Sequence, residues 1–491
     1  MVYFLLSKIF QPIVSRPWKS ISAVEMISKS QRLMLDNGLI EYVGGKGLFH
    51  YLPVGLRALE KLCIIIRHEM DLLGAGRMAL SNLCERSVWE QTGRWEEVSA
   101  ELLRLKDRKG KEYCLCPTHE ESVTSLISRF SPITSSRLPL LLYQITLKYR
   151  DEPNPRFGLA RAREFFMKDM YSFDLDTKSA MKTYDAVNKA YFSIFQTLGI
   201  KVHCVEAAVG SIGGNLSHEF HCESQYGEDY FLMCEKCQKK FTEEVLVNST
   251  TCPVCNEPFQ KVRSLELAHT FFLGEKYSQA LGATVTCNPG SPIPLQMGCF
   301  GIGISRLLAA IVDYFSSDEE IRWPLCVAPY KVCVIPPKNG SREYPATPMA
   351  LHLAEQLSSL ANFNEEIVYD DRTHQTVGTR LRDAKRRGYP YVIVANKTVF
   401  NKSSPKFELH CTATDEVLET ADGIHSVEDI NFESRQTIGS TSGLYNSSRN
   451  GQFVMKSTLS FFHLESECDN GKSSKSLNDE DLLDEKNKSN K

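Results

Sequence analysis

One polar stretch, residues 148–174, constrains this chain more than any other. It reads KYRDEPNPRFGLARAREFFMKDMYSFD, in which two strand-type runs flank a loop rich in Pro, Gly and Arg. Arg150 and Glu152 end the first run, and Arg161 and Phe165 follow the loop. Guanidinium groups bind phosphates bidentately and an aromatic ring stacks on a base, so the hairpin predicts a nucleotide site. An ordinary surface hairpin with scattered charges is the alternative.

A second element with phosphate-binding character lies downstream. Residues 298–306 read GCFGIGISR, and an apolar run with helical spacing follows. Gly301 and Gly303 allow a ligand to approach the backbone closely, and Arg306 falls near the expected helix start, where anions are favoured. The run lacks the Gly-Lys-Ser/Thr of a P-loop and the full dinucleotide fingerprint. Taken alone, it also fits a tight strand-to-helix turn.

Together the two elements resemble motifs 2 and 3 of class II aminoacyl-tRNA synthetases. The resemblance implies that Arg150 binds the α-phosphate of ATP and Arg306 the γ-phosphate. It places Glu152 at the adenine end, Phe165 on the base and Arg161 near the outer phosphates. The candidate catalytic residues are therefore Arg150, Glu152 and Arg306, the two glycines complete the ATP site, and Mg²⁺ is the implied cofactor.

Three further segments resemble prolyl-tRNA synthetases in particular, and most of all the mitochondrial enzymes of animals. They are residues 116–121 (CPTHEE), 210–220 (GSIGGNLSHEF) and 266–274 (ELAHTFFLG). A hydroxyl and a carboxylate suit the charged imino group of proline, since a neutral pocket would leave that charge unpaired. The resemblance implies an L-proline pocket made of Thr118, Glu120, His218 and Phe271. A plain helix cap, a core histidine and a core phenylalanine remain the alternatives.

The resemblance implies a ligase that activates proline with ATP and transfers it to tRNA(Pro) for mitochondrial translation. It also implies a homodimer in the mitochondrial matrix. Two alternatives stay open: another class II enzyme of the threonyl or glycyl type, or a non-catalytic synthetase-like RNA-binding protein. The net charge of −3 requires any RNA contact to come from local basic patches. No apolar run is long enough to span a bilayer, so no membrane association is expected.

The order of expected elements predicts an α+β fold followed by a smaller α/β domain. Over residues 26–325 we expect an antiparallel sheet flanked by helices, the class II catalytic domain. Strands and helices alternate over residues 326–430, which predicts a parallel core and resembles an anticodon-binding domain. A helix over 53–73 and a strand near 78–80 match motif 1, in which family members usually carry Pro where this chain has Ser81.

The two ends of the chain differ in composition from the rest. The first 24 residues contain no Asp or Glu, so residues 1–25 are expected to be a mitochondrial transit peptide. A secretory signal and an unprocessed N-terminus are the alternatives. Residues 431–491 are rich in Ser, Asn, Lys and acidic side chains and are expected to be disordered. Within the α/β domain, a helix over 377–387 is expected to present a basic face made of Arg380, Arg382, Lys385, Arg386 and Arg387.

Four cysteines form two paired motifs within residues 231–260. They are Cys234, Cys237, Cys252 and Cys255, arranged as two Cys-x-x-Cys pairs. Four thiolates in paired turns suit tetrahedral Zn²⁺ in a structural role. A redox pair or a remnant without metal are the alternatives.

Overall fold

The computed structural model describes residues 3–14, 27–246, 250–286, 291–400 and 406–419. The expected disordered tail at 431–491 lies outside these ranges, as does the second half of the expected transit peptide. Within these ranges, no helix is long and apolar enough to cross a membrane.

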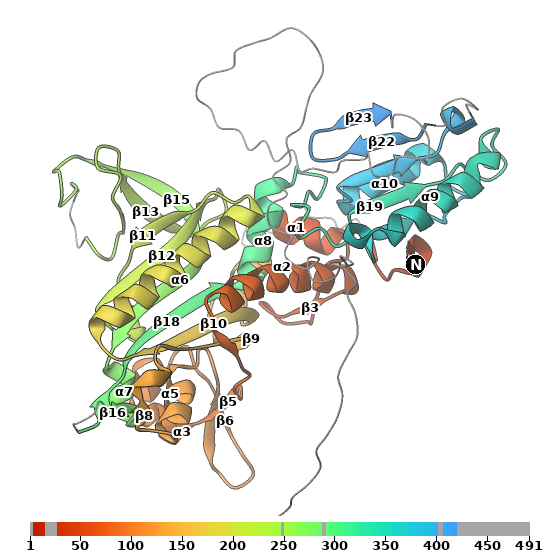
Figure 1. Cartoon of the computed structure of the whole chain (residues 1–491). Helices are drawn as coiled ribbons and strands as arrows, with labels where there is room; N and C mark the ends of the chain where they lie inside the picture. Colours follow the sequence, from red (N-terminus) through yellow and green to blue (C-terminus); the bar gives the residue numbers. More distant parts are fainter. Residues whose placement is uncertain (1–2, 15–26, 247–249, 287–290, 401–405, 420–491) are drawn as a thin grey trace, which may run out of the picture. The chain divides into compact units, whose positions relative to one another are not determined.

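A nine-stranded sheet, in which most neighbouring strands are antiparallel, carries the candidate site (Figure 1). Its four central strands are β15 (Phe259–Gly274), β18 (Gln296–Gly303), β10 (Glu164–Asp174) and β9 (Leu140–Tyr149), all antiparallel to their neighbours in this order. The flanking strands are β12 (Leu216–Glu223), β11 (His203–Glu206), β14 (Lys240–Thr242), β13 (Asp229–Cys234) and β4 (Gly76–Arg77). The antiparallel sheet expected from the sequence is confirmed.

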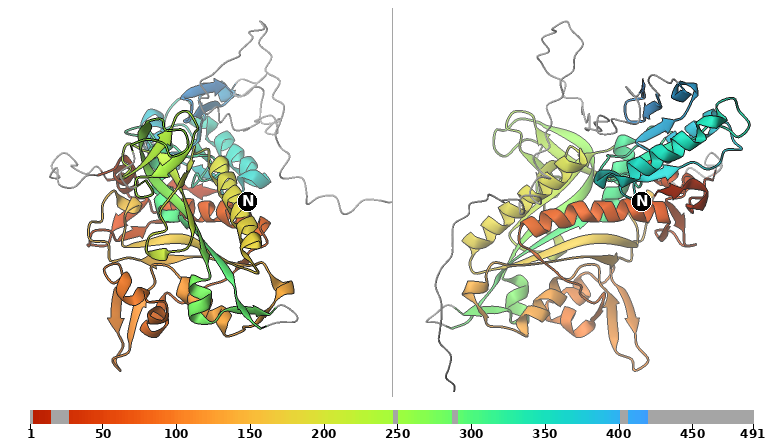
Figure 2. Two further views of the ribbon diagram at one scale, coloured as in Figure 1. Left: turned by 90° about the vertical axis from the view of Figure 1, so that its left-hand side faces the viewer. Right: turned by 45° about the vertical axis from the view of Figure 1, so that its right-hand side comes forward.

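Long helices cover one face of this sheet (Figure 2). They are α1 (Lys29–Asp36), α2 (Pro53–Leu72), α6 (Thr177–Leu198) and α8 (Ile304–Phe315). Helix α6 begins with a capping box between Asp176 and Ser179 and ends at Gly199, whose φ of 71° suits glycine. Its apolar stripe, which includes Tyr191 and Phe195, is buried against alternate residues of the strands, such as Met170 and Phe300.

Shorter elements lie over the opposite face, where the other alternate residues of the strands point. The helices are α3 (Arg86–Gln91), α4 (Arg94–Glu97), α5 (Glu120–Ser128) and α7 (Lys276–Leu281). The short strands of this region are β5 (Leu83–Glu85), β6 (Leu103–Lys106), β7 (Glu112–Leu115), β8 (Ile133–Thr134), β16 (Thr284–Thr286) and β17 (Ile293–Pro294). A separate pair, β2 (Ile40–Tyr42) and β3 (Phe49–Tyr51), forms a hairpin.

A second sheet follows α8 in the chain and has the parallel core expected there. Its central strands β20 (Ile367–Tyr369), β19 (Val332–Ile335) and β21 (Tyr391–Val394) are parallel. Two antiparallel strands extend it, β22 (Glu408–Cys411) and β23 (Glu416–Glu419), and its helices are α9 (Thr347–Ser359) and α10 (Val377–Arg387). A strand from the other end of the chain, β1 (Phe4–Leu5), completes this sheet beside β20.

Two details differ from the sequence-based expectation. The motif 1 strand lies earlier than expected: β4 spans Gly76–Arg77 and ends before the expected residues 78–80, where Leu80 donates its backbone N–H to the Gln144 side chain at 2.9 Å. The basic face of α10 is also smaller. Arg380 is buried and donates to the backbone carbonyl of Pro336 at 2.6 Å, and Arg387 pairs with Asp383 at 3.0 Å.

Candidate active site

A cavity of about 350 Å³ brings the two predicted phosphate-binding elements together. Its lining includes all of the side chains and glycines that the sequence assigned to ATP: Arg150, Glu152, Arg161, Phe165, Gly301, Gly303 and Arg306. Thr118 and Phe271, from two of the three segments assigned to proline, line the same cavity. Segments from distant parts of the sequence therefore form one site, as the sequence predicts.

The register of the sheet explains which side chains reach the cavity. Asp169 on β10 and His269 on β15 both pair with Gly301 on β18, and Glu219 on β12 pairs with His269. Side chains in one such row share one face of the sheet, and all four residues line the cavity. A Cβ at Gly301 would have Met167 Sδ, 3.8 Å away, as its nearest neighbour. Glycine there therefore leaves open space above the strand.

Carboxylates hold two of the three candidate arginines. Arg161 pairs with Glu152 at 2.9 Å and with Glu228 at 2.6 Å. Arg306, in the first turn of α8, pairs with Glu266 at 2.8 Å. Burial alone would raise the pKa of Glu266, but the His269 hydrogen bond and the Arg306 charge hold it below its ordinary value. These carboxylates fix the orientation of the two guanidinium groups.

Arg150 differs from the other two. Its guanidinium carbon lies 5.5 Å from the centre of the Phe165 ring, and no carboxylate of the described residues lies within ion-pair distance of it. Burial lowers the pKa of this guanidinium below its ordinary value, although an arginine still keeps its charge. A partly buried guanidinium without an ion-pair partner, in the wall of a cavity, suits an anionic group of a ligand.

The Thr118 loop leads into α5 and brings a carboxylate to the edge of the cavity. Glu120 is fully buried, and its Oε1 accepts from the Thr118 hydroxyl at 2.8 Å and from the Cys299 thiol at 3.0 Å. Burial raises the pKa of Cys299 well above its ordinary value, so the thiol stays protonated and donates. Thr118 and Cys299 line the cavity, and Glu120 lies directly behind them.

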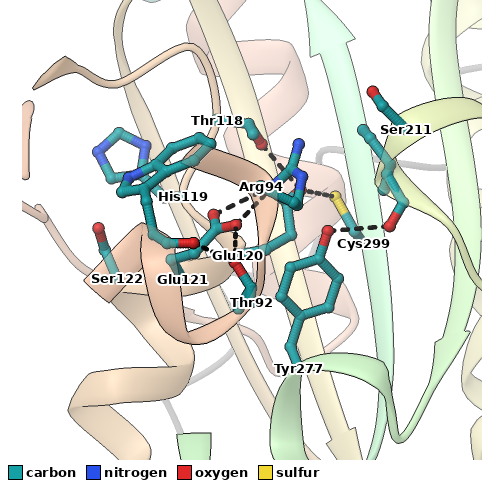
Figure 3. A network of polar contacts seen from close by, with 12 residues as sticks. Thr92, Arg94, Thr118, His119, Glu120, Glu121, Ser122, Ser211, Tyr277 and Cys299 are labelled. Atoms are coloured by element: carbon teal, nitrogen blue, oxygen red, sulfur yellow. Dashed lines mark hydrogen bonds and ion pairs between the residues drawn. The ribbon is translucent and has the colours of Figure 1, made fainter. Parts of the chain in front are cut away.

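A buried arginine that the sequence analysis missed completes this corner (Figure 3). Arg94 Nη1 contacts the two carboxylate oxygens of Glu121 at 2.9 and 3.1 Å and reaches Glu120 Oε2 at 3.4 Å. Its guanidinium lies 5.1 Å from the Trp89 ring and 5.7 Å from the Tyr277 ring. One guanidinium between two carboxylates leaves a net negative charge, which suits a cationic group of a ligand.

Comparison with known proteins agrees with this geometry. Residues 103–315 match the family described as tRNA synthetase class II core domain (G, H, P, S and T), and residues 331–408 match the anticodon binding domain. The probable mitochondrial proline–tRNA ligase of Homo sapiens is 44% identical over 427 residues, which cover 86% of this chain and 90% of the human protein. The chain belongs to the proline–tRNA ligase family. The synthetase resemblance and the prolyl type expected from the sequence are thereby confirmed.

More distant members of this family extend the comparison. The probable mitochondrial proline–tRNA ligase of Schizosaccharomyces pombe is 39% identical and covers 77% of this chain and 88% of its own length. The solved structure of Giardia lamblia prolyl-tRNA synthetase in complex with prolyl-adenylate superposes with a TM-score of 0.68 at 16% identity, over 80% of this chain and 74% of that one. That likeness supports the fold, with a class II core followed by an anticodon-binding domain.

One residue assigned to the proline pocket lies elsewhere. His218 pairs with Thr270 on the helix-covered face of the sheet, where its Nδ1 lies 2.8 Å from the Tyr184 hydroxyl. His269 lines the cavity in its place, and its ring stacks on Phe271 at 3.8 Å. The signal was available, because His269 is two residues from Phe271 and residues two apart in a strand share a face.

A buried histidine, His119, holds the Thr118 loop. The His119 Nε2–H donates to the carbonyl of Ser81 at 3.1 Å, and its backbone N–H donates to the Tyr171 hydroxyl at 2.8 Å. Tyr171 in turn donates to Asp169 at 2.9 Å. Ser81, where the family usually has proline, thus takes part in positioning this loop through its backbone carbonyl.

His119 should make stability depend on pH. Burial lowers the pKa of its imidazole to about 4, and the neighbouring Lys148 ammonium acts in the same direction. In the unfolded chain the imidazole has a pKa near 6.5. Between pH 6.5 and pH 4 the unfolded chain therefore binds more protons than the folded one, and the free energy of unfolding falls as the pH drops through this range. Between pH 7 and pH 5, wild type should lose about 2 kcal/mol more than His119→Asn. Denaturant titrations at both pH values test this, and equal losses would contradict it.

Two groups of side chains have the geometry of metal ligands. The first lies in the cavity: Glu219, Glu266 and His269 each offer a ligand atom, and these atoms lie within 4.8 Å of one another. The second is formed by the four cysteines of the Cys-x-x-Cys pairs, whose sulfurs also lie within 4.8 Å of one another. Sulfur atoms of the two pairs approach to 3.2 Å (Cys234 and Cys255) and 3.5 Å (Cys237 and Cys252).

The two cysteine turns are copies of one another. In the first, Cys234 N–H donates to Lys239 and the Gln238 N–H donates back to Cys234 O, both at 2.9 Å. In the second, Cys252 makes the same two bonds with Glu257 and Asn256 at 2.8 Å. The residue after each pair has a positive φ, 59° at Gln238 and 61° at Asn256. Paired turns of this kind present four sulfurs to one point.

Proposed function

We propose that the chain is a proline–tRNA ligase that activates L-proline with ATP and transfers it to tRNA(Pro). The observation that carries the proposal is the cavity itself, because it places Arg150, which has no carboxylate partner among the described residues, in one site with the Thr118 and Glu120 corner. The first suits a phosphate and the second suits a cationic imino group. The two sites adjoin in one cavity, as a reaction between proline and the α-phosphate requires.

The chemistry has two steps. A proline carboxylate oxygen attacks the α-phosphorus of ATP, the bond to the β-phosphate oxygen breaks, and pyrophosphate leaves. A terminal ribose hydroxyl of the tRNA then attacks the prolyl carbonyl carbon, and AMP leaves. The first step brings anions together, which costs about 4 kcal/mol per unit charge pair at 4 Å and an effective dielectric constant of 20. Fixed guanidinium groups offset this cost without reorganising.

Each cavity residue has a role in this scheme. Arg150 binds the α-phosphate, Arg306 binds the γ-phosphate, and Phe165 stacks on the adenine. Arg161 exchanges its carboxylates Glu152 and Glu228 for the outer phosphates, which frees Glu152 to face the adenine end.

The proline pocket has its own set of contacts. The imino group binds at the Thr118 hydroxyl, with the Glu120 carboxylate directly behind it, while the pyrrolidine ring lies against the stacked rings of Phe271 and His269. Each methylene that a smaller substrate lacks weakens its transition-state binding in such a pocket by only about 1–3 kcal/mol. Alanine, which lacks the ring, should therefore still be activated at a low rate.

Magnesium fits the carboxylate group in the cavity. Glu219 and Glu266 supply oxygen ligands beside Arg306, and Mg²⁺ binds proteins through one or two carboxylates together with substrate phosphates. The ion would supply neutralisation of phosphate charge during the first step. The residues of this chain orient the phosphates and hold the reacting groups in line.

Charging of tRNA tests the proposed activity most simply. The purified protein, ATP, Mg²⁺ and radiolabelled proline should yield acid-precipitable prolyl-tRNA with a mitochondrial tRNA(Pro) transcript. A tRNA(Thr) transcript serves as the control and should remain uncharged. Formation of prolyl-adenylate without charging of any mitochondrial tRNA would contradict the second step.

The cysteine turns fit a structural zinc ion. Tetrahedral Zn²⁺ with Zn–S bonds of about 2.3 Å separates its sulfurs by about 3.8 Å, within reach of the distances here. We expect one zinc per chain by elemental analysis. Cys234→Ser should lose the zinc and lower the melting temperature, whereas Cys411→Ser, outside the cluster, should change neither. Wild-type protein free of zinc, or equal zinc in both variants, would contradict the assignment.

The assembly and location follow from the same proposal. Helix α2 exposes apolar side chains on the side away from the sheet, with Ile64 57% and Leu72 68% exposed, which suits a homodimer through motif 1. The anticodon-binding domain presents Arg382, Lys385 and Arg386 to the tRNA. The mitochondrial relatives support a location in the mitochondrial matrix.

A further inference from the structure

The first described residues belong to the sheet that the other end of the chain forms. β1 pairs in parallel with β20, with Phe4 opposite Val368 and Leu5 opposite Tyr369. It forms one edge of the six-stranded sheet, and Figure 1 shows this red segment beside the teal and blue elements. A strand in this position covers backbone groups of β20 that would otherwise be exposed.

Side chains fix this strand in place. Leu6 is 4% exposed and belongs to the apolar cluster that contains Tyr330, and the Phe4 ring lies 5.2 Å from the Tyr330 ring. Ser7 donates from its backbone N–H and from its hydroxyl to the two oxygens of Asp371, at 2.9 and 2.5 Å. The segment is therefore held by apolar burial and by charge-assisted hydrogen bonds.

The contacts continue beyond the strand. The Gln11 side chain accepts from Arg387 at 2.8 Å and donates to the Asn37 carbonyl at 2.9 Å. Gly38 packs directly on Pro12: a Cβ at Gly38, whose φ is +62°, would lie 2.3 Å from the Pro12 carbonyl oxygen. Residues 4–14, here called the N-terminal strap, thus contact both α10 and the residues that follow α1.

We infer that the N-terminal strap stays in the functional protein as part of its fold and is not removed as a targeting sequence. A cleaved presequence is absent from the mature chain, so the mature fold does not depend on it. Removal of residues 1–25 would leave the β20 edge uncovered and would deprive Asp371 of two donors. Whatever precedes residue 4, processing has to spare the strap.

The N-terminus of the mature protein tests this directly. The full chain with a C-terminal tag is expressed in animal cells, purified from their mitochondria and digested for mass spectrometry. Peptides that contain residues 4–14 should be present at the same molar amount as peptides from α6. A mature N-terminus at or after residue 15 would overturn the inference.

A matched pair of apolar variants tests whether the strap supports the fold. Leu6 and Phe10 lie four residues apart, but Leu6 is 4% exposed and Phe10 is 64% exposed. Leu6→Ala should lower the melting temperature by about 5 °C, whereas Phe10→Ala should change it by about 1 °C or less. Deletion of residues 1–14 should lower it further than Leu6→Ala. Equal shifts for the two point variants, or an unchanged melting temperature after the deletion, would overturn the structural role.

Discussion

Replacement of Arg150 by alanine should reduce proline-dependent ATP–pyrophosphate exchange by about 10²- to 10³-fold, because a preorganised donor to the reacting phosphate is lost. Among the cavity arginines, Arg150 is the one whose replacement tests phosphate binding most directly. Arg161 and Arg306 already pair with carboxylates, whereas Arg150 has no such partner among the described residues. The loss should appear mainly in kcat, since charge develops on the α-phosphate in the transition state.

A stability control separates this result from unfolding. Arg150 makes no ion pair among the described residues, so the alanine variant should stay folded and melt close to wild type. Arg129→Ala, at an exposed arginine that follows α5, should keep wild-type exchange. Exchange within threefold of wild type in a folded Arg150→Ala protein would refute the assignment of the α-phosphate to this side chain.

Replacement of Arg94 by methionine should raise KM for proline by at least about 10²-fold and leave KM for ATP within a few-fold of wild type. Arg94 lies at the Glu120 and Glu121 end of the cavity (Figure 3), and its ion pairs among the described residues are with these two carboxylates. Without the guanidinium, two carboxylates would be buried side by side. Burial already raises the pKa of Glu121, so one of the pair would take up a proton and the pocket would lose its fixed arrangement.

A second substitution tests this explanation. Glu121→Gln in the Arg94→Met background removes one carboxylate and restores the net charge of the corner. It should therefore lower KM for proline at least tenfold relative to Arg94→Met alone. The double variant should also be more stable than Arg94→Met alone, because one buried carboxylate without an arginine partner then remains instead of two. Equal increases in both KM values, or a double variant no better than the single one, would contradict a role for Arg94 in positioning Glu120.

The regular elements were predictable from local sequence. The sequence predicts strands over 140–149 and 164–173 and a helix over 177–198, and β9, β10 and α6 lie within one residue of these ranges. Alternation, helical periodicity and capping residues are all local signals. The parallel core of the second sheet was likewise evident from strands alternating with helices. The ATP side of the cavity followed from two motifs that carry their chemistry in a few consecutive residues.

The missed features depend on contacts between distant residues. That His218 faces away from the cavity follows from its pairing with Thr270 on another strand, although the position of His269 two residues from Phe271 was a local signal for that residue. Arg94 starts a four-residue helix without useful periodicity, and its partners lie 26 and 27 residues away. β1 has two residues and pairs with a strand more than 300 residues later.

The central claim is that one cavity binds ATP and proline so that their reacting groups meet. ATP–pyrophosphate exchange with each of the twenty amino acids in turn tests it most directly. The account predicts rapid exchange with proline, a low rate with alanine, and none above background with threonine, glycine or the others. Exchange that is fastest with another amino acid, or absent with all of them in folded protein, would contradict it.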